Sequence, residues 1–400
     1  MGPKRKASST KSSPESEPHQ HATPSKSSKS RKDSAPSSSS GGAALKAPRI
    51  PHRTTGLSPL STDVEDAADW EIMKENAKLR IDSYVPVGEA IRNAENILKP
   101  SLHALLEWLP PGGRDHHARI ILNARSDKDL WEHFWNVCCY LAAPMKTSTR
   151  YSSTVDSAET KSAHHSAVAS TLTEPQGRLK EFSQPLLRRD NHCCVVSSII
   201  NYQYAEETGL SYDIPAALTE GAHITPYSYA SWKTLVYTLP IRMRTKRTSA
   251  WTFLYESFPA LRNTIHAESI NDPVNGMTLL TDLHTWFGDF RLAFEATDRP
   301  NEYKILTFGR PLATAGHIPE KVTFTNAAPD DISLPSPVLL HCHCVMAKFF
   351  HASGMGETVE KFMRKWDDLK QGPGSHALRG DGKSDLDKFL SAALWEYIRG

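Results

Sequence analysis

The sequence predicts an α+β protein, with a mixed central domain between helical N-terminal and C-terminal regions. Apolar residues recur at helical spacing near both ends of the folded part of the chain. In the middle, Phe290, Leu292 and Phe294 alternate with Arg291 and Glu295, which is the period of a half-buried strand. The 400 residues are enough for about two or three compact units and a sizeable core.

Residues 1–62 have the composition of a disordered tail. Fourteen of the first 50 residues are serine, and almost none is apolar, so burial cannot offset the entropy of ordering. These 50 residues carry a net charge of +7, whereas the remaining 350 carry −5. Lys4-Arg5-Lys6 and Lys29-Ser30-Arg31-Lys32 are candidate nuclear-import signals. The alternative is a solvated tail that carries no import signal.

The pattern of cysteines and the shortness of the apolar runs favour an intracellular location. Import by the basic clusters would make that location the nucleus. The six cysteines form close pairs without any Cys-x-x-Cys spacing, so we expect free thiols in a reducing compartment. No run approaches the roughly 18 apolar residues of a membrane span. The N-terminus also lacks the apolar stretch of a secretory signal.

Residues 63–145 are predicted to be helical, and residues 146–180 to be a polar linker rich in serine and threonine. Thr62 and Glu65 have the spacing of a capping box ahead of an apolar run that includes Trp70. Further helices are expected at 87–98, 101–108, 115–124 and 127–142, with a break at Pro110–Gly113.

Residues 181–326 are predicted to form the mixed domain, and residues 327–400 a helical segment. Short strand-like runs in the domain cover 193–196, 290–295 and 303–308. Helices are expected in the final segment at 337–352, 357–369 and 384–398. Gly354 and Gly356 separate the first two of these helices.

Two histidines and an asparagine are the candidate catalytic set. His223 follows a predicted strand end, whereas Leu280, Leu283 and Phe287 have helical spacing. That spacing predicts Asn275 at the start of a helix and His284 on its body. One imidazole of such a set can take a proton from water while another binds a divalent cation. The alternative is a pair of structural histidines in the core.

Four motifs in order resemble those of the HNH endonuclease family, most closely a branch common in fungal proteins. They are RDNHCCVV at 189–196, AHITPYS at 222–228, INDPVNGMTLL at 270–280 and DLHTWFG at 282–288. The flanking runs LPPGGR at 109–114 and LLHCHCVMAKFFHASGMGE at 339–357 extend the resemblance.

The resemblance implies a ββα-metal fold and metal-dependent hydrolysis of DNA; RNA is a second substrate that the motifs do not separate. His223 matches the general base that activates water. Asn275 matches the residue that holds the loop of this base or assists the metal, and His284 matches a metal ligand on the helix. The divalent cation, usually Mg²⁺, stabilises charge on the phosphate and on the leaving oxygen.

This chain departs from the family pattern at two positions. Many relatives carry an aspartate or histidine ligand before the base, where this sequence has Ala222. Relatives often carry Phe-Asp after the last histidine, where this sequence has Phe287-Gly288 and Asp289. Asp282 is a candidate substitute ligand. The alternative function is a non-catalytic module on a degenerate HNH scaffold, which binds nucleic acid or another protein.

A basic run between the motifs is the candidate contact for phosphates. It consists of Arg242, Arg244, Lys246 and Arg247. Lysine and arginine gain affinity for DNA by releasing counterions. The alternative is a solvated loop.

Two other clusters contain metal-ligand residue types. We interpret Asp115-His116-His117 as a solvated helix start and His341–Cys344 as part of a buried helix.

Overall fold

The computed structural model describes residues 62–86, 95–146, 176–227, 229, 250–310, 318–328 and 332–360. The predicted tail, most of the linker, the basic run at 242–247 and the last predicted helix lie outside these ranges. The fold is α+β, as the sequence predicts. None of the described helices is long and apolar enough to cross a membrane.

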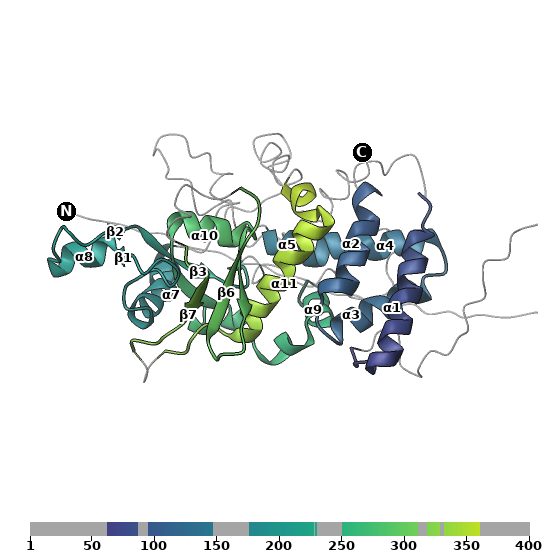
Figure 1. The fold of residues 1–400 in the computed structure, drawn as a ribbon, viewed down its shortest axis with the longest axis horizontal. Helices are drawn as coiled ribbons and strands as arrows, with labels where there is room; N and C mark the ends of the chain where they lie inside the picture. Colours follow the sequence, from purple (N-terminus) through teal and green to yellow (C-terminus); the bar gives the residue numbers. More distant parts are fainter. Residues whose placement is uncertain are drawn as a thin grey trace, which may run out of the picture. The chain divides into compact units, whose positions relative to one another are not determined.

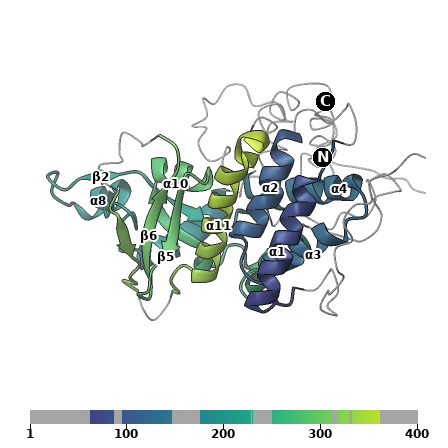
Figure 2. The same ribbon diagram turned by 45° about the vertical axis from the view of Figure 1, so that its right-hand side comes forward.

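The N-terminal part of the described chain is helical. Its elements are α1 (Ala67–Asp82), α2 (Glu95–Trp108), α3 (Gly113–Asn123), α4 (Asp127–Val137), the π-helical turn η2 (Cys138–Ala142) and α5 (Ala143–Lys146). Trp70, Ala77 and Ile81 form the buried stripe of α1, as their spacing predicts. Figures 1 and 2 show α11 (Pro337–Ser353) between α2 and the strands, and it packs on α2 and on β5 (Leu292–Ala296).

The capping box predicted at Thr62 and Glu65 is wrong. Asp66 caps α1, and its carboxylate accepts hydrogen bonds from the backbone of Ala68 and Asp69 at 3.0 and 2.9 Å. Glu65 instead forms a buried ion pair with Arg119 of α3, at 2.8 Å. A local pattern cannot anticipate this pair, since its members are 54 residues apart.

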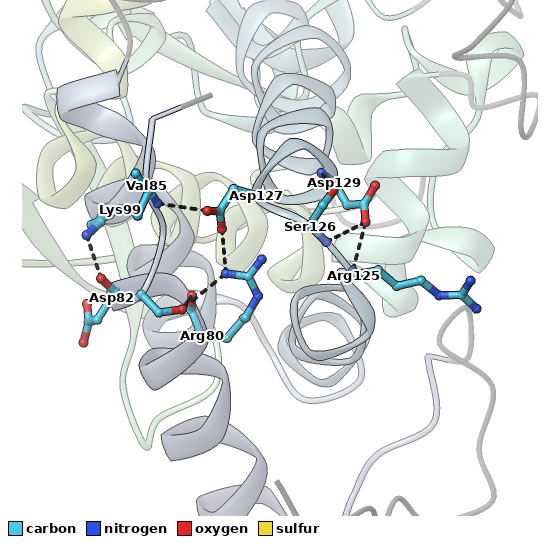
Figure 3. Close-up of polar contacts among 9 residues, drawn as sticks. Arg80, Asp82, Val85, Lys99, Arg125, Ser126, Asp127 and Asp129 are labelled. Carbon is cyan, nitrogen blue, oxygen red and sulfur yellow. Dashed lines mark hydrogen bonds and ion pairs between the residues drawn. The ribbon is translucent and has the colours of Figure 1, made fainter. Parts of the chain in front are cut away.

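The start of α4 holds the end of α1 (Figure 3). Arg80 of α1 donates to Asp127 at 2.9 Å, and the other carboxylate oxygen of Asp127 accepts from the backbone of Val85 at 3.2 Å. Ser126 caps α4, and its backbone amide donates to the Asp129 carboxylate at 3.0 Å. Acidic side chains here also meet the positive end of the helix dipole.

Two strands and a helix follow one another in the central domain. Strand β3 (Thr219–His223) pairs antiparallel with β4 (Gly276–Leu280), and α10 (Thr281–Gly288) follows β4 directly. Helix α7 (Gln176–Arg189) packs against both strands. It starts inside the predicted linker, so residues 176–180 are helical.

The remaining strands form two small sheets. Strands β5, β6 (Glu302–Thr307) and β7 (Lys321–Thr323) are antiparallel, which confirms the strand runs predicted near 290–295 and 303–308. A parallel pair joins β1 (Ile200–Asn201) to β2 (Ala216–Ala217), with α8 (Tyr202–Thr208) between them. The other helical elements are α9 (Ala250–Ser257) and the 3-10 turns η5 (Pro259–Asn263), η6 (Ala267–Ser269) and η7 (Pro273–Asn275).

Two local predictions are wrong in this domain. The run 193–196 is not a strand, because Asn191 and His192 have φ of 54° and 56° and turn the chain just before it. Asn275 does not begin a helix but ends η7, and all of β4 separates it from α10. Residues 276–279 are buried on both faces of β4. Their sequence therefore lacks the alternation of polar and apolar residues that distinguishes a strand from a helix.

Candidate functional site

Asn275 fastens the turn that follows β3. Its side chain is fully buried, and its amide oxygen accepts from the Thr225 amide at 2.7 Å. The amide nitrogen donates to the carbonyl oxygens of Thr225 and Ile270 at 3.0 and 2.8 Å. Since all these bonds end on backbone, the side chain fixes the path of the chain directly after His223.

His223 is the last residue of β3, and its half-buried ring is held from two directions. The imidazole stacks on Phe182 of α7, with ring centres 3.8 Å apart and planes 6° from parallel. Its Nε2 lies 2.9 Å from the side-chain oxygen of Asn271. Because an amide oxygen only accepts, this contact places a hydrogen on Nε2 and the lone pair of the ring on Nδ1.

The surroundings of His223 keep its imidazole neutral. Burial lowers the pKa of His223 to about 4, although the hydrogen bond to Asn271 opposes the shift. The nearby His284 also lowers the pKa of His223. At pH 7 the ring is therefore unprotonated and able to accept a proton. Asn271 lies inside the INDPVNGMTLL motif, but no local pattern predicted its contact with His223.

Gly276 lies directly across the strand pair from His223. The Phe182 ring covers this glycine so closely that a Cβ here would collide with it, and would lie 2.8 Å from Leu186 Cδ1. Lack of a side chain at 276 thus lets α7 place Phe182 beneath the His223 ring.

Arg189 and Asp190 tie the end of α7 to the start of β4. Arg189 is fully buried and makes a two-bonded pair with the Asp190 carboxylate, at 2.7 and 3.0 Å. Arg189 also donates to the carbonyl oxygens of Pro273 and Gly276, each at 2.9 Å. The Asp190 carboxylate accepts from the Thr278 amide at 2.8 Å. This motif therefore positions the strand pair.

His284 lies on α10, as predicted, and its Nδ1 is 2.6 Å from a carboxylate oxygen of Glu220 on β3. The side chains of His284 and Glu220 are 22% and 34% exposed. Side chains alternate along a strand, so Glu220 and Ala222 share the face toward α10, whereas His223 points to the face covered by α7. Glu220 was not predicted as a site residue. Alternation along a strand, which places residues 220 and 222 on one face, is a signal in the sequence that would have indicated it.

A comparison of the sequence with models of known protein families matches the region that contains these residues. Residues 194–295 match the model of a family described as HNH endonuclease. The chain contains an HNH endonuclease domain. The matched range covers β3, β4 and α10, and so includes His223, Asn275 and His284. No curated protein and no solved structure matches the chain, and the fungal branch stays a prediction.

The HNH domain brings together two side chains that fit a divalent cation. Within the described ranges, no group of three or more His, Cys, Asp or Glu side chains is arranged to hold a metal ion. The pair that does converge is the His284 imidazole and the Glu220 carboxylate. Mg²⁺ keeps several waters and takes one or two carboxylates together with substrate phosphates, so a small protein donor set suits it.

Asp282, the predicted substitute ligand, is exposed on the first turn of α10. Residues two apart on a helix lie about 200° around its axis, so Asp282 and His284 leave α10 in different directions. The basic run of Arg242, Arg244, Lys246 and Arg247 lies outside the described residues.

The Asp115-His116-His117 cluster is buried rather than solvated, because the start of α3 packs against α9. His117 contacts His133 of α4 at 3.1 Å and Ser257 of α9 at 3.0 Å. The prediction for the second cluster is confirmed for Cys342, His343 and Cys344, which are buried in α11, whereas His341 is exposed. All six cysteines are free thiols.

Proposed function

We propose that the HNH domain hydrolyses DNA phosphodiester bonds with the help of a divalent cation, and that its β3–β4–α10 unit works as a ββα-metal site. HNH nuclease domains act on DNA, and residues 194–295 are such a domain. The observation that carries the proposal is the state of His223. Its ring is neutral, oriented by Asn271, and close enough to His284 for the two to influence each other.

In the proposed reaction, His223 takes a proton from the attacking water. The imidazolium that forms still donates from Nε2 to Asn271, and this hydrogen bond strengthens as the ring gains charge. Asn275 keeps the turn after His223 in place, so the base does not have to be ordered during the reaction. His284 belongs to the cation site, and a bound cation supplies charge stabilisation for the phosphate and the leaving 3′-oxygen.

The test is nicking of a supercoiled plasmid by the full chain, with Mg²⁺ and with EDTA. We expect His223→Ala to lower the Mg²⁺-dependent rate by about 10²–10⁴-fold, which is the usual contribution of a general base. Circular dichroism and DNA affinity should be retained. His266→Ala is the matched control, since His266 is an exposed histidine of the same domain. Wild-type nicking by His223→Ala would end the proposed mechanism.

The second candidate is a binding module without catalysis, and Ala222 favours it. Alanine has no donor for a cation, and this one is fully buried at the position before the base. This candidate predicts DNA binding without nicking in Mg²⁺ or Mn²⁺, for the wild type as well as for His223→Ala. The same assay on a labelled RNA shows which nucleic acid is cut.

A further inference from the structure

We propose that Glu220 is a ligand of the divalent cation together with His284, in place of the missing ligand at position 222. This inference rests on the proposed function, because it names the residues of the same site. It differs from the sequence prediction, which offered Asp282 as the substitute.

The strand geometry places Glu220 where a substitute ligand is needed. Positions 220 and 222 point to the same face of β3, about 7 Å apart along the strand. That face meets α10, and the Glu220 carboxylate reaches His284 of that helix. The proposed ligand therefore lies two residues before position 222, where the family carries its ligand, and on the same face of β3.

The distance between the two side chains suits a shared ion. His284 Nδ1 and the nearer Glu220 oxygen are 2.6 Å apart, with one hydrogen between them. Two ligand atoms at about 2.1 Å from one octahedral ion, and at right angles, lie about 3 Å apart. Exchange of that hydrogen for an ion thus lengthens the separation of the nitrogen and the oxygen by only a few tenths of an ångström, while the carboxylate swings about 2 Å off the N–H axis to leave room for the ion. Both side chains are partly exposed, so solvent and a phosphate can complete the shell.

The charge of the pair also suits the ion. A carboxylate supplies the oxygen ligand and the negative charge that Mg²⁺ prefers, whereas an imidazole alone supplies neither. Asp282 has the right chemistry but leaves α10 on another side.

The first measurement is calorimetric titration of Mn²⁺ into the full chain without nucleic acid. We expect Glu220→Gln to weaken binding by at least tenfold, and Asp282→Asn to leave it unchanged. Glutamine keeps an oxygen that accepts from His284 Nδ1, so this variant removes the charge but retains the shape. Wild-type affinity in Glu220→Gln would overturn the proposal, and a loss in Asp282→Asn alone would move the role to Asp282.

The second measurement separates a ligand from a residue that only orients His284. Histidine ¹⁵N spectra of the wild type with and without Zn²⁺ report which ring nitrogen meets the ion. We expect His284 Nδ1 to lose its hydrogen when Zn²⁺ binds. If Nδ1 keeps that hydrogen while Nε2 shifts, Glu220 only orients the ring and the proposal is wrong.

These outcomes do not depend on cleavage. If Glu220→Gln loses Mn²⁺ while the wild type never nicks DNA, the cation site stands and the nuclease proposal fails. If His223→Ala abolishes nicking while Glu220→Gln binds Mn²⁺ normally, the nuclease stands and the ligand proposal fails.

Discussion

Gly276 shows how much of the candidate site depends on the absence of one side chain. The Phe182 ring lies against it, and the same ring stacks on His223. A methyl group at 276 would force Phe182 to move, and the imidazole would lose its support.

We therefore expect Gly276→Ala to lower the nicking rate by tenfold or more and to destabilise the fold by about 1–3 kcal/mol, the usual cost of overpacking. Gly221→Ala is the control, because the atoms nearest to its Cβ would belong to Ser183 and Leu186, at 3.2–3.3 Å, and not to Phe182. Urea unfolding and the nicking assay measure both effects. Equal behaviour of the two variants would show that the stacking on Phe182 does not matter.

At the scale of elements, buried histidines connect helices that are far apart in the sequence. His117 of α3 lies between His133 of α4 and Ser257 of α9. His343 of α11 lies between the rings of Phe287 and Phe290, at 3.7 and 4.5 Å, and contacts the Phe287 carbonyl at 2.9 Å. Burial lowers the pKa of His133 and of His343 to about 3, and that of His117 well below its usual value.

These shifts predict that acid destabilises the fold. Above the ordinary histidine pKa of about 6.5, both folded and unfolded states hold neutral rings, and the stability from these groups is complete. Below this pKa the histidines of the unfolded chain take up protons, whereas the buried histidines of the folded protein stay neutral. Stability then falls by about 1.4 kcal/mol per pH unit for each such histidine, until the pH reaches the folded pKa.

Urea unfolding of the wild type and His133→Gln between pH 7 and pH 4 tests this prediction. Glutamine retains a hydrogen-bonding partner for His117 but does not titrate, so the slope of stability against pH should flatten by about one histidine's share. His266→Gln, at an exposed site, is the control substitution. An unaltered slope in His133→Gln would mean that this ring takes up its proton equally in the folded and the unfolded state.

At the scale of the whole molecule, net charge limits where the proposed DNA substrate is able to bind. Residues 51–400 carry a net charge of −5, so binding must use local groups of cations. The run of Arg242, Arg244, Lys246 and Arg247 is the densest such group outside the tail. Contacts to phosphates carry no base information, so this run should strengthen binding to all sequences alike.

We expect four phosphate contacts from this run to contribute about −3.6 to the slope of log affinity against log salt, at about −0.9 for each contact. Replacement of all four residues by alanine, in a protein that lacks residues 1–50, should flatten the slope by that amount. Fluorescence anisotropy with a short duplex across a salt series measures it. A slope that does not change would identify the run as a solvated loop and place the DNA surface elsewhere.

Local sequence patterns predicted the α+β class and several elements directly. The stripe of α1 and the alternation of β5 were readable because each involves neighbours within a few residues. The same reasoning failed at 193–196, because two residues with positive φ turn the chain just before this run. It also failed at Asn275, because β4 is buried on both faces and shows no alternation.

The sequence by itself predicted which residues carry the proposed chemistry, since His223, Asn275 and His284 stand in recognisable motifs. Only the tertiary structure decided what surrounds them. Asn271 meets His223 across 48 residues, and Glu220 meets His284 across 64. No periodicity spans such separations, because these contacts form only when β3 pairs with β4 and α10 packs on that pair. Tertiary packing therefore sets the tautomer and pKa of His223 and brings Glu220 to His284.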